Sequence, residues 1–330
     1  MNFKKPYIIA EIGINHEGKF NKASNLIKLA KYGGADAVKF QVFNPNTIAY
    51  KKTAKSTQHK KTTKKSESNH EMWKRLRLNL NQLKKLKKIS SFYKLDFICS
   101  VFDIESLEIL KKLNCKFIKI ASSEITDLYL LKKINSISKY NIISTGMANL
   151  NEIRRAVKIF GEKNICLLHC ASLYPCDPSL VNMQRMQSLK KKFPKSVIGY
   201  SNHAIGIEAP ILALSMGAEC IEVHFTDNKR QIGADHLLSV DHHDLKIVSK
   251  FAKNIVKMKG TGSLNISRTE KQNRYFFRKS AYAKNQIKKG DKYSFENVII
   301  RRPCKTNNLP KFYKLLGKKS KKNLKAGDNI

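Results

Sequence analysis

The stretch Val197–Asp227 reads VIGYSNHAIGIEAPILALSMGAECIEVHFTD and decides the expected fold. Two short apolar runs, Val197–Tyr200 and Cys220–Val223, flank the segment Ile205–Met216, whose apolar residues recur at helical spacing. This order of strand, helix and strand is typical of a βαβ unit, in which the two parallel strands end at the same edge of a sheet. We therefore expect the polar residues that follow the two runs to converge.

Each of these polar clusters contains one histidine. His203 follows the first run and His224 the second, with Ser201 and Glu222 beside them. Two converging imidazoles with a nearby carboxylate are typical ligands of a divalent cation, which makes this edge a candidate metal site. The alternative is two unrelated loop histidines, and the spacing alone does not decide between the two interpretations.

The rest of the chain repeats the same alternation. Strands are predicted at Tyr7–Ile12, Ala37–Phe40, Asp96–Ser100, Phe117–Ile120, Asn141–Ser144 and Ile165–His169, and helices at Asn21–Tyr32, Leu80–Tyr93, Ile104–Leu113, Leu128–Ile137, Leu150–Phe160, Val181–Lys192 and Asp241–Met258. Eight such units in about 260 residues predict an α/β fold, the (β/α)8 TIM barrel. An open doubly wound sheet is the rival, but Gly13–Gly18 (GINHEG) lacks the GxGxxG turn expected after its first strand.

Three parts of the chain depart from this alternation. The lysine-rich run Lys51–Lys65 is predicted to be a solvated loop, because like charges repel one another. The polar range 260–278 suits a linker between a barrel domain at 1–259 and a small β-rich domain at 279–330. A domain of roughly fifty residues buries little core, so we expect it to lean on another surface.

Composition excludes several classes of protein. The 330 residues carry a formal net charge of +39, but the lysines are spread along the whole chain, which favours solvated helix faces over a nucleic-acid interface. Seven cysteines without a CxxC pair fit a reducing cytoplasm. No apolar stretch reaches the length of a membrane span. We expect a soluble cytoplasmic protein that binds neither nucleic acid nor membrane.

Polar residues collect where the predicted strands end, and in a barrel these ends line one face. They are Glu11, Lys39, Gln41, Ser100, Lys119, Ser122, Glu124, Ser144, Thr145, His169, Ser172, Tyr174, Ser201, His203, Glu222 and His224. Each could be a helix cap or an ordinary ion pair. Together, two lysines and several hydroxyls predict a site for a phosphorylated anion, next to the two-histidine metal site.

Several motifs carry a family resemblance that spans essentially the full chain. They are AEIGINHEG (10–18), DAVKFQ (36–41), IKIASSE (118–124), STGM (144–147), LLHCASLYP (167–175), IGYSNH (198–203) and EVHFTD (222–227), followed by VIIRRP (298–303) and LLGKK (315–319). In this order they resemble the sialic acid (N-acetylneuraminate) synthases, and residues 279–330 resemble their antifreeze-like (SAF) domain.

The resemblance implies condensation of phosphoenolpyruvate with an N-acetylmannosamine-type hexose to give a nine-carbon sialic acid and phosphate. It implies a divalent metal on His203 and His224, usually Mn²⁺, with Mg²⁺ or Co²⁺ in its place in some members. It also implies a domain-swapped homodimer in which Arg302 reaches the partner's site. The positions that match phosphoenolpyruvate contacts are Lys39, Ser100, Lys119, Ser122, Ser144, Ser172 and Ser201, and those around the sugar are Glu11, Gln41, Tyr174 and Asp235. Glu124 also belongs to the expected binding set.

The mechanism and the acceptor stay open at this point. Lys119 would offset phosphate charge, and either Glu11 or Glu222 would handle the attacking water. Asn202 stands where the family has aspartate, and GADH (233–236) and PCKTNN (303–308) depart from the family pattern around the sugar. Related synthases make legionaminic or pseudaminic acid from diacetamido hexoses. Two further interpretations are an aldolase or lyase with a Schiff base on Lys119, and a basic nucleic-acid-binding protein.

Overall fold

Eight parallel strands close into a barrel in a computed structural model that describes residues 3–64 and 66–330. The strands are β1 (Tyr7–Gly13), β2 (Ala37–Val42), β3 (Asp96–Val101), β4 (Ile118–Ile120), β5 (Asn141–Ser144), β6 (Ile165–His169), β7 (Val197–Asn202) and β8 (Cys220–His224). Each pairs with its neighbour in sequence, and β8 closes the barrel on β1. The predicted (β/α)8 barrel is confirmed.

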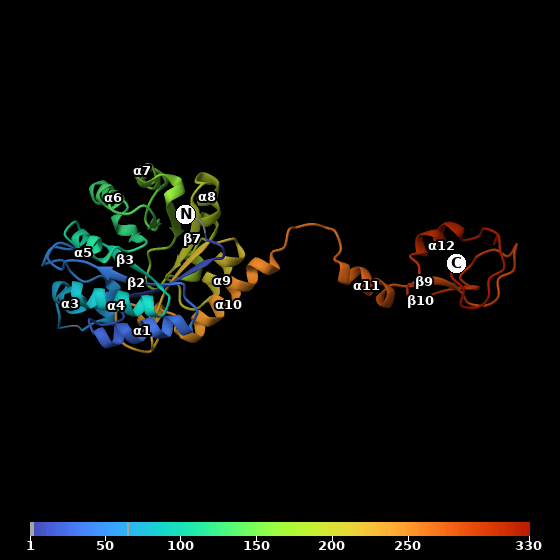
Figure 1. Ribbon diagram of the computed structural model, residues 1–330, viewed down its shortest axis with the longest axis horizontal. Helices are drawn as coiled ribbons and strands as arrows, with labels where there is room; N and C mark the ends of the chain where they lie inside the picture. Colours follow the sequence, from blue (N-terminus) through green and yellow to red (C-terminus); the bar gives the residue numbers. More distant parts are fainter. Residues whose placement is uncertain (1–2, 65) are drawn as a thin grey trace. The chain divides into compact units, whose positions relative to one another are not determined.

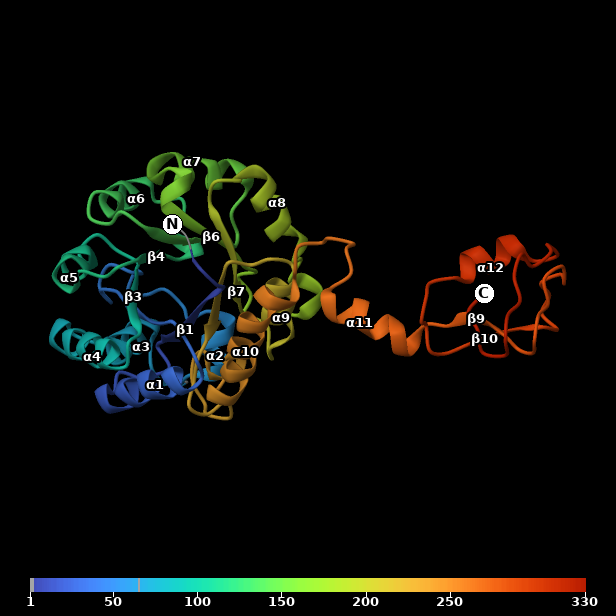
Figure 2. The same cartoon turned by 45° about the vertical axis from the view of Figure 1, so that its right-hand side comes forward.

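Helices surround the strands (Figures 1 and 2). They are α1 (Phe20–Tyr32), α4 (Leu80–Phe92), α5 (Ser106–Leu113), α6 (Leu128–Asn135), α7 (Leu150–Phe160), α8 (Gln184–Lys192), α9 (Glu208–Ser215) and α10 (His242–Met258), with single 3-10 turns at Ser122–Glu124, Glu162–Asn164, Pro178–Leu180 and His236–Leu238. Capping residues determine where several of these helices begin. Asn149, for example, accepts from the Glu152 amide at 3.0 Å, and the Glu152 carboxylate accepts from the Asn149 amide in return.

The inward-facing side chains of the strands form two layers. Ile9 and Ile98 belong to an apolar cluster inside the barrel, and two residues further along the same strands stand Glu11 and Ser100. Because side chains alternate across a strand, residues two apart point the same way. The polar layer therefore lies above an apolar plug, at the carboxyl ends of the strands.

Strand register places the polar residues of this layer directly beside one another. Glu11 pairs with Lys39 on β2 and with His224 on β8, so it stands between a lysine and a histidine. In the same way Ser100 pairs with Lys119, and Ser201 with Glu222. These pairings bring polar residues that are far apart in the sequence side by side at the carboxyl ends of β1 to β4, β7 and β8.

The connection from β2 to α4 is more ordered than the sequence predicts. It contains helices α2 (Thr57–Thr62) and α3 (Asn69–Leu76), and α2 lies inside the run that we expected to be a solvated loop; Lys65, at the end of that run, is outside the described residues. The prediction of a loop is wrong for Thr57–Thr62, which forms α2, although this helix buries none of its residues. The next helix, α3, lies beyond the run and is held in place by Met72 and Leu76, which belong to a small apolar cluster. Tertiary packing orders a segment whose own sequence shows little periodicity.

Residues Gly260–Ile330 form a second compact unit, separate from Met1–Lys259. The range expected to be a linker contains helix α11 (Arg268–Phe277), and strands β9 (Ser280–Ala283) and β10 (Val298–Arg301) pair antiparallel. Helix α12 (Leu309–Leu315) packs on β9 and adds Phe312 to a core that this unit builds from its own residues. The resemblance of this unit to an antifreeze-like domain stays a prediction.

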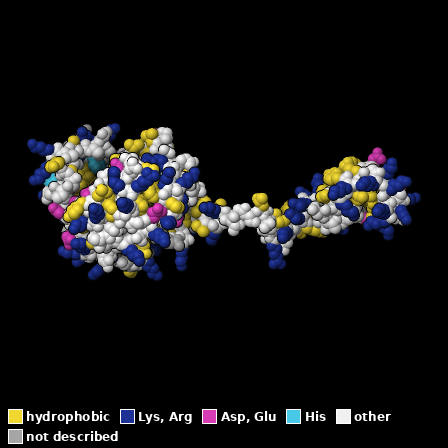
Figure 3. Space-filling view, turned by 90° about the horizontal axis from the view of Figure 1, so that it is seen from above, with side chains coloured by type: hydrophobic (Ala, Val, Ile, Leu, Met, Phe, Trp, Pro, Cys, Tyr) yellow, Lys and Arg dark blue, Asp and Glu magenta, His cyan; other side chains and the backbone are white. Residues whose placement is uncertain are grey.

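Two observations bear on partners. Among the described residues, no helix combines the length and the apolar character needed to cross a membrane. On the face shown in Figure 3, the Lys and Arg side chains are scattered among other side chains and do not gather on one element. A nucleic-acid binder normally concentrates its basic residues on one face, so this distribution counts against a nucleic-acid-binding protein.

Candidate active site

Four charged side chains form a closed cluster at the carboxyl ends of the strands. The Lys39 ammonium lies 3.0 Å from Glu11 Oε2 and 3.6 Å from Glu222 Oε2. The Lys119 ammonium lies 3.3 Å from the other Glu222 oxygen, which also accepts a hydrogen bond from Ser201 at 3.0 Å. Gln41 donates to Glu11 Oε1 at 3.0 Å. All four charges are buried, and two carboxylates balance two ammonium groups.

The two carboxylates of this cluster differ in pKa. Burial opposes ionisation of Glu222, but the charges of Lys119 and Lys39 outweigh it and lower its pKa to about 2. Burial raises the pKa of Glu11; Lys39 offsets this in part, and the Glu222 charge adds to it. Burial also lowers the pKa of Lys119, which the Glu222 charge opposes. Glu222 is therefore a fixed counterion, and Glu11, whose pKa is raised, is the carboxylate better suited to exchange a proton.

A group of hydroxyls lies at the ends of the next three strands. Ser122, Ser144 and Ser172 follow or end β4, β5 and β6 and line the same cavity as the charged cluster. The Oγ atoms of Ser144 and Ser172 are buried and have no hydrogen-bond partner among the described residues. Buried hydroxyls normally have a partner, so two unpaired ones indicate a place for a ligand with acceptor oxygens.

A glycine keeps the space between these hydroxyls open. The Gly146 amide donates to Ser122 Oγ at 3.0 Å. A Cβ on Gly146 would come within 2.3 Å of Ser172 Oγ and 2.9 Å of Ser122 Oγ, which no real Cβ tolerates. A side chain at this position would therefore require Ser172, Ser122 or Cys170 to move, and the group of hydroxyls, which we call the hydroxyl cradle, is a candidate site for a small anion.

The two histidines converge as the sequence predicts. The ring centroids of His203 and His224 are 5.4 Å apart, and the Tyr174 ring lies 4.1 Å from His203. Burial lowers the pKa of His203 to about 4 and that of His224 well below its usual value, so both rings are neutral at pH 7. His203 Nδ1 donates to the Ala171 carbonyl at 2.6 Å, which leaves the lone pair on Nε2.

These two imidazoles fit a divalent cation. A metal-ligating histidine commonly donates its other ring nitrogen to a backbone carbonyl, as His203 does to Ala171. His224 Nδ1 is buried without a hydrogen bond, 3.5 Å from Asp235 Oδ2. Within residues 3–64 and 66–330, no cluster of three or more His, Cys, Asp or Glu residues is arranged to hold a metal. The pair would therefore leave the remaining coordination positions to substrate and water.

Comparison with known proteins places this geometry in a family. The model of the NeuB family matches residues 26–264. The chain belongs to the NeuB family. Its curated relatives include the N,N'-diacetyllegionaminic acid synthase of Campylobacter jejuni subsp. jejuni, with 40% identity over 99% of both chains, and the pseudaminic acid synthase of the same organism, with 33% identity over 99% of this chain and 96% of the relative.

A solved structure of another relative supports the same assignment. The N-acetylneuraminic acid (sialic acid) synthetase from Leptospira borgpetersenii serovar Hardjo-bovis, crystallised in complex with citrate, shares 32% identity with this NeuB-family chain. The two structures superpose with a TM-score of 0.71 over 82% of this chain and 90% of the other. The predicted membership of the sialic acid synthase family is confirmed.

Most of the site residues expected for a NeuB-family chain line one cavity of about 510 Å³. They are Glu11, Lys39, Gln41, Ser100, Lys119, Ser122, Ser144, Ser172, Tyr174, Ser201, His203, Glu222, His224 and Asp235. The volume lies in the usual range for small-molecule sites. Their roles in binding and catalysis stay predictions.

Four candidate residues lie elsewhere. Thr145 does not line the cavity, and its Oγ1 donates to the Leu168 carbonyl at 3.1 Å. Glu124 does not line the cavity, although Ser122 and Ser123 of the same 3-10 turn do, because the turn points its third residue away. His169 Nε2 donates a hydrogen bond to the Val181 carbonyl at 2.7 Å, and its ring packs beside that of Tyr200, so this histidine has a structural role. Arg302 belongs to the second unit, where its Nε donates to the Phe277 carbonyl at 2.9 Å.

Sequence reasoning missed one side of the cavity. Further lining residues come from the β2–α4 connection and the loops beside it: Ile14, Ser56, Thr57, Gln58, His59, Trp73, Phe102 and Met147. The one tryptophan of the chain, inside a lysine-rich and otherwise polar segment, was the signal that could have found this wall.

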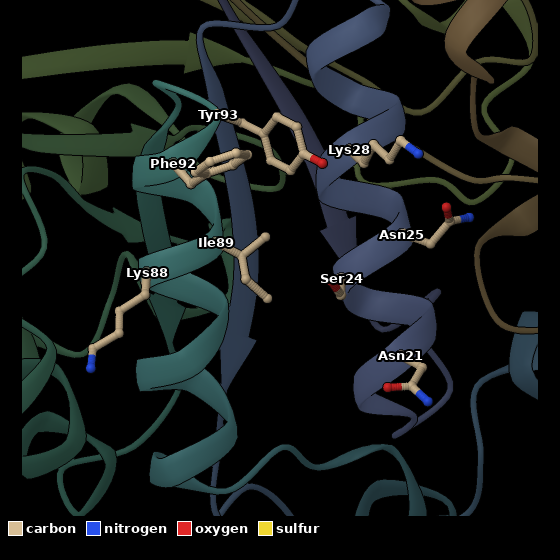
Figure 4. A pocket seen from close by; sticks show the side chains of 8 residues that line it. All are labelled: Asn21, Ser24, Asn25, Lys28, Lys88, Ile89, Phe92 and Tyr93. Carbon is tan, nitrogen blue, oxygen red and sulfur yellow. The ribbon is translucent and has the colours of Figure 1, made fainter.

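A second hollow of about 580 Å³ lies outside the barrel, between α1 and α4. Figure 4 shows Ile89, Phe92 and Tyr93 of the α4 region facing the polar side chains of α1, among them Ser24 and Asn25. None of its described lining residues is a carboxylate, a histidine or a cysteine. The cavity at the barrel mouth, which is lined by both carboxylates and histidines, is therefore the candidate active site.

Proposed function

We propose that this protein condenses phosphoenolpyruvate with an N-acylated aminohexose to give a nonulosonic acid and phosphate. The observation that carries the proposal is the buried cluster of Lys39, Lys119, Glu11 and Glu222 beside two converging neutral histidines. The names of the relatives, which are synthases of legionaminic, pseudaminic and N-acetylneuraminic acids, support the reaction class. N-acetylmannosamine is the simplest acceptor, and a diacetamido hexose fits equally well.

Phosphoenolpyruvate would lie between the lysines and the hydroxyl cradle. Lys39 and Lys119 already neutralise two carboxylates, so the cluster by itself offers little net positive charge to a phosphate. His203 and His224 are the residues that would hold a divalent cation, which would supply that charge and Lewis-acid polarisation of the acceptor aldehyde. The unpaired hydroxyls of Ser144 and Ser172 would donate to phosphate oxygens.

The reaction then needs one carbon–carbon bond and one water. C3 of phosphoenolpyruvate attacks the aldehyde carbon of the open-chain hexose, and the aldehyde oxygen becomes the hydroxyl of the product. Water adds at C2, its proton passes to a base, and cleavage of the C–O bond releases phosphate. Glu11 is the base we propose, because burial raises its pKa, whereas the ammonium groups keep Glu222 ionised.

The second unit has a proposed role in a dimer. If residues 279–330 are an antifreeze-like domain, Arg302 would complete the partner's acceptor site in a domain-swapped homodimer. The arginine is exposed, and its guanidinium lies over the Phe277 ring, 5.9 Å from the centroid. A planar, exposed guanidinium is suited to hydrogen-bond a sugar or a carboxylate.

The test measures phosphate release from phosphoenolpyruvate by the purified protein with Mn²⁺, with and without an acceptor. We expect release only when N-acetylmannosamine or a diacetamido hexose is present, and loss of release after metal removal. His224→Ala should lose activity and Mn²⁺ retention together, whereas the exposed His243→Ala should keep both. No release with either acceptor would refute the proposal, and a borohydride-trapped Schiff base on Lys119 would favour an aldolase instead.

A further inference from the structure

One wall of the cavity comes from a segment that the barrel fold does not require. Helices α2 and α3 interrupt the connection from β2 to α4, and Met72 and Leu76 of α3 anchor them by packing with Ile14 and Phe43. Trp73 contacts the Phe43 ring edge to face at 4.9 Å and also lines the cavity. The anchor therefore holds an aromatic side chain at the mouth of the site.

A single side chain of α2 connects this wall to the opposite loop. Gln58 Nε2 donates to the Ala234 carbonyl at 2.6 Å and to Asp235 Oδ1 at 3.3 Å. Asp235 in turn lies 3.5 Å from His224, one of the two candidate metal ligands. Gln58 thus bridges the wall and the metal side of the cavity.

The bridge leaves one polar atom of Gln58 for a ligand. Its side-chain amide nitrogen is committed to Ala234 and Asp235, and no hydrogen bond to its side-chain oxygen, Oε1, is found among the residues that the structure describes. Ile14, Trp73 and Phe102 line the same cavity as Gln58 and offer apolar surface there. Apart from Asp235, to which Gln58 donates, the lining residues of this wall are uncharged at pH 7, whereas Lys39, Lys119 and Glu222 line the same cavity elsewhere.

We propose that Gln58 and Trp73 determine the choice of acceptor by binding an acylamino group of the hexose. The proposal rests on the proposed function and names which residues select the substrate. The Gln58 carbonyl oxygen accepts the acylamino N–H, and the Trp73 ring packs on the acyl methyl. A hydroxyl in place of the acylamino group still has a proton to donate to Gln58 but lacks the acyl methyl that packs on Trp73, which costs affinity. A hexose with two acylamino groups gains most from such a wall.

Trp73 allows this proposal to be tested without turnover. It is the only tryptophan of the chain, so intrinsic fluorescence reports on this wall alone. In the full-length protein with Mn²⁺, a 2,4-diacetamido hexose should change Trp73 emission saturably, and N-acetylmannosamine should do so at higher concentration. Phosphoenolpyruvate alone should have little effect. Emission that responds to neither hexose, while either one supports phosphate release, would overturn the proposal.

The variant Gln58→Leu distinguishes an effect on acceptor binding from a general loss of activity. It should raise KM for the diacetamido hexose about tenfold, the worth of one hydrogen bond, and leave KM for phosphoenolpyruvate within about twofold. The matched control is Lys60→Ala, because Lys60 is exposed on the same helix and does not line the cavity. Equal increases in both KM values, or an unchanged KM for the hexose, would overturn the proposal. If no acceptor supports phosphate release, the proposed function fails, while hexose binding measured at Trp73 still tests the wall.

Discussion

The carboxylate of Glu222 lies 3.3 Å from the ammonium group of Lys119, in a layer where neither side chain reaches bulk solvent. Lys39 approaches the other oxygen of the same carboxylate at 3.6 Å. Removing one partner of a buried ion pair leaves an uncompensated charge, which costs more than the pair contributes. Glu222 is therefore needed for the barrel to keep two lysines charged at its mouth.

Glu222→Gln should lower both stability and activity. We expect a loss of about 3 kcal/mol in the free energy of unfolding, measured by urea denaturation, because Lys119 loses its buried counterion. Phosphate release should fall at least a hundredfold, because Lys39 and Lys119 lose a carboxylate that neutralises their charge and holds them in place. Glu219→Gln is the control, because its pair with Lys190 at 2.8 Å is exposed and should contribute little. A Glu222→Gln protein as stable as this control would contradict the argument.

The sequence predicted the barrel and most of its rim because both depend on local periodicity. Each strand shows as a short apolar run, and the polar residues that follow it must gather at one face once the strands are parallel. Register then brings Ser201 beside Glu222 and Ser100 beside Lys119 without further information. The prediction that Glu124 lines the site failed, because the conformation of the 3-10 turn Ser122–Glu124 decides which of its side chains face the cavity.

The wall formed by α2 and α3 could not be predicted in the same way. Helix α2 has no buried residue, so its sequence carries no apolar periodicity. Its place depends on the contact of Gln58 with Asp235, which lies 177 residues away in the chain. Contacts between residues so far apart in the chain form only when the loops meet above the folded barrel. A local sequence pattern cannot predict them, because it never includes both residues.

Gly146→Ala tests the hydroxyl cradle. The new methyl group would stand 2.3 Å from Ser172 Oγ and 2.8 Å from the buried Cys170 sulfur, so the cradle must open or close over the anion position. We expect KM for phosphoenolpyruvate to rise at least tenfold in steady-state assays of phosphate release. Mn²⁺ retention and the hexose response of Trp73 should be unchanged, because the cradle lies apart from both. An unaltered KM for phosphoenolpyruvate would remove the cradle from the binding site.

His16 lies buried in the turn after β1, away from the candidate metal ligands. Its Nδ1 accepts a hydrogen bond from the Gly18 amide at 2.9 Å, and its ring is tilted against Phe40 at 6.0 Å. Burial lowers its pKa from 6.5 to about 4; the nearby Lys22 charge acts in the same direction, and Glu17 opposes it. A proton on Nδ1 would also abolish the hydrogen bond from Gly18.

This depressed pKa makes the stability of the barrel depend on pH. Between pH 6.5 and 4 the unfolded chain binds a proton at His16 and the folded protein does not, so stability falls as the pH falls through this window and is constant above it. The full effect is about 3 kcal/mol, at 1.36 kcal/mol for each pKa unit. In urea denaturation at pH 7 and pH 4.5, His16→Gln should lose less stability between the two pH values than the natural sequence. Equal losses in the two proteins would show that His16 is not held neutral by the fold.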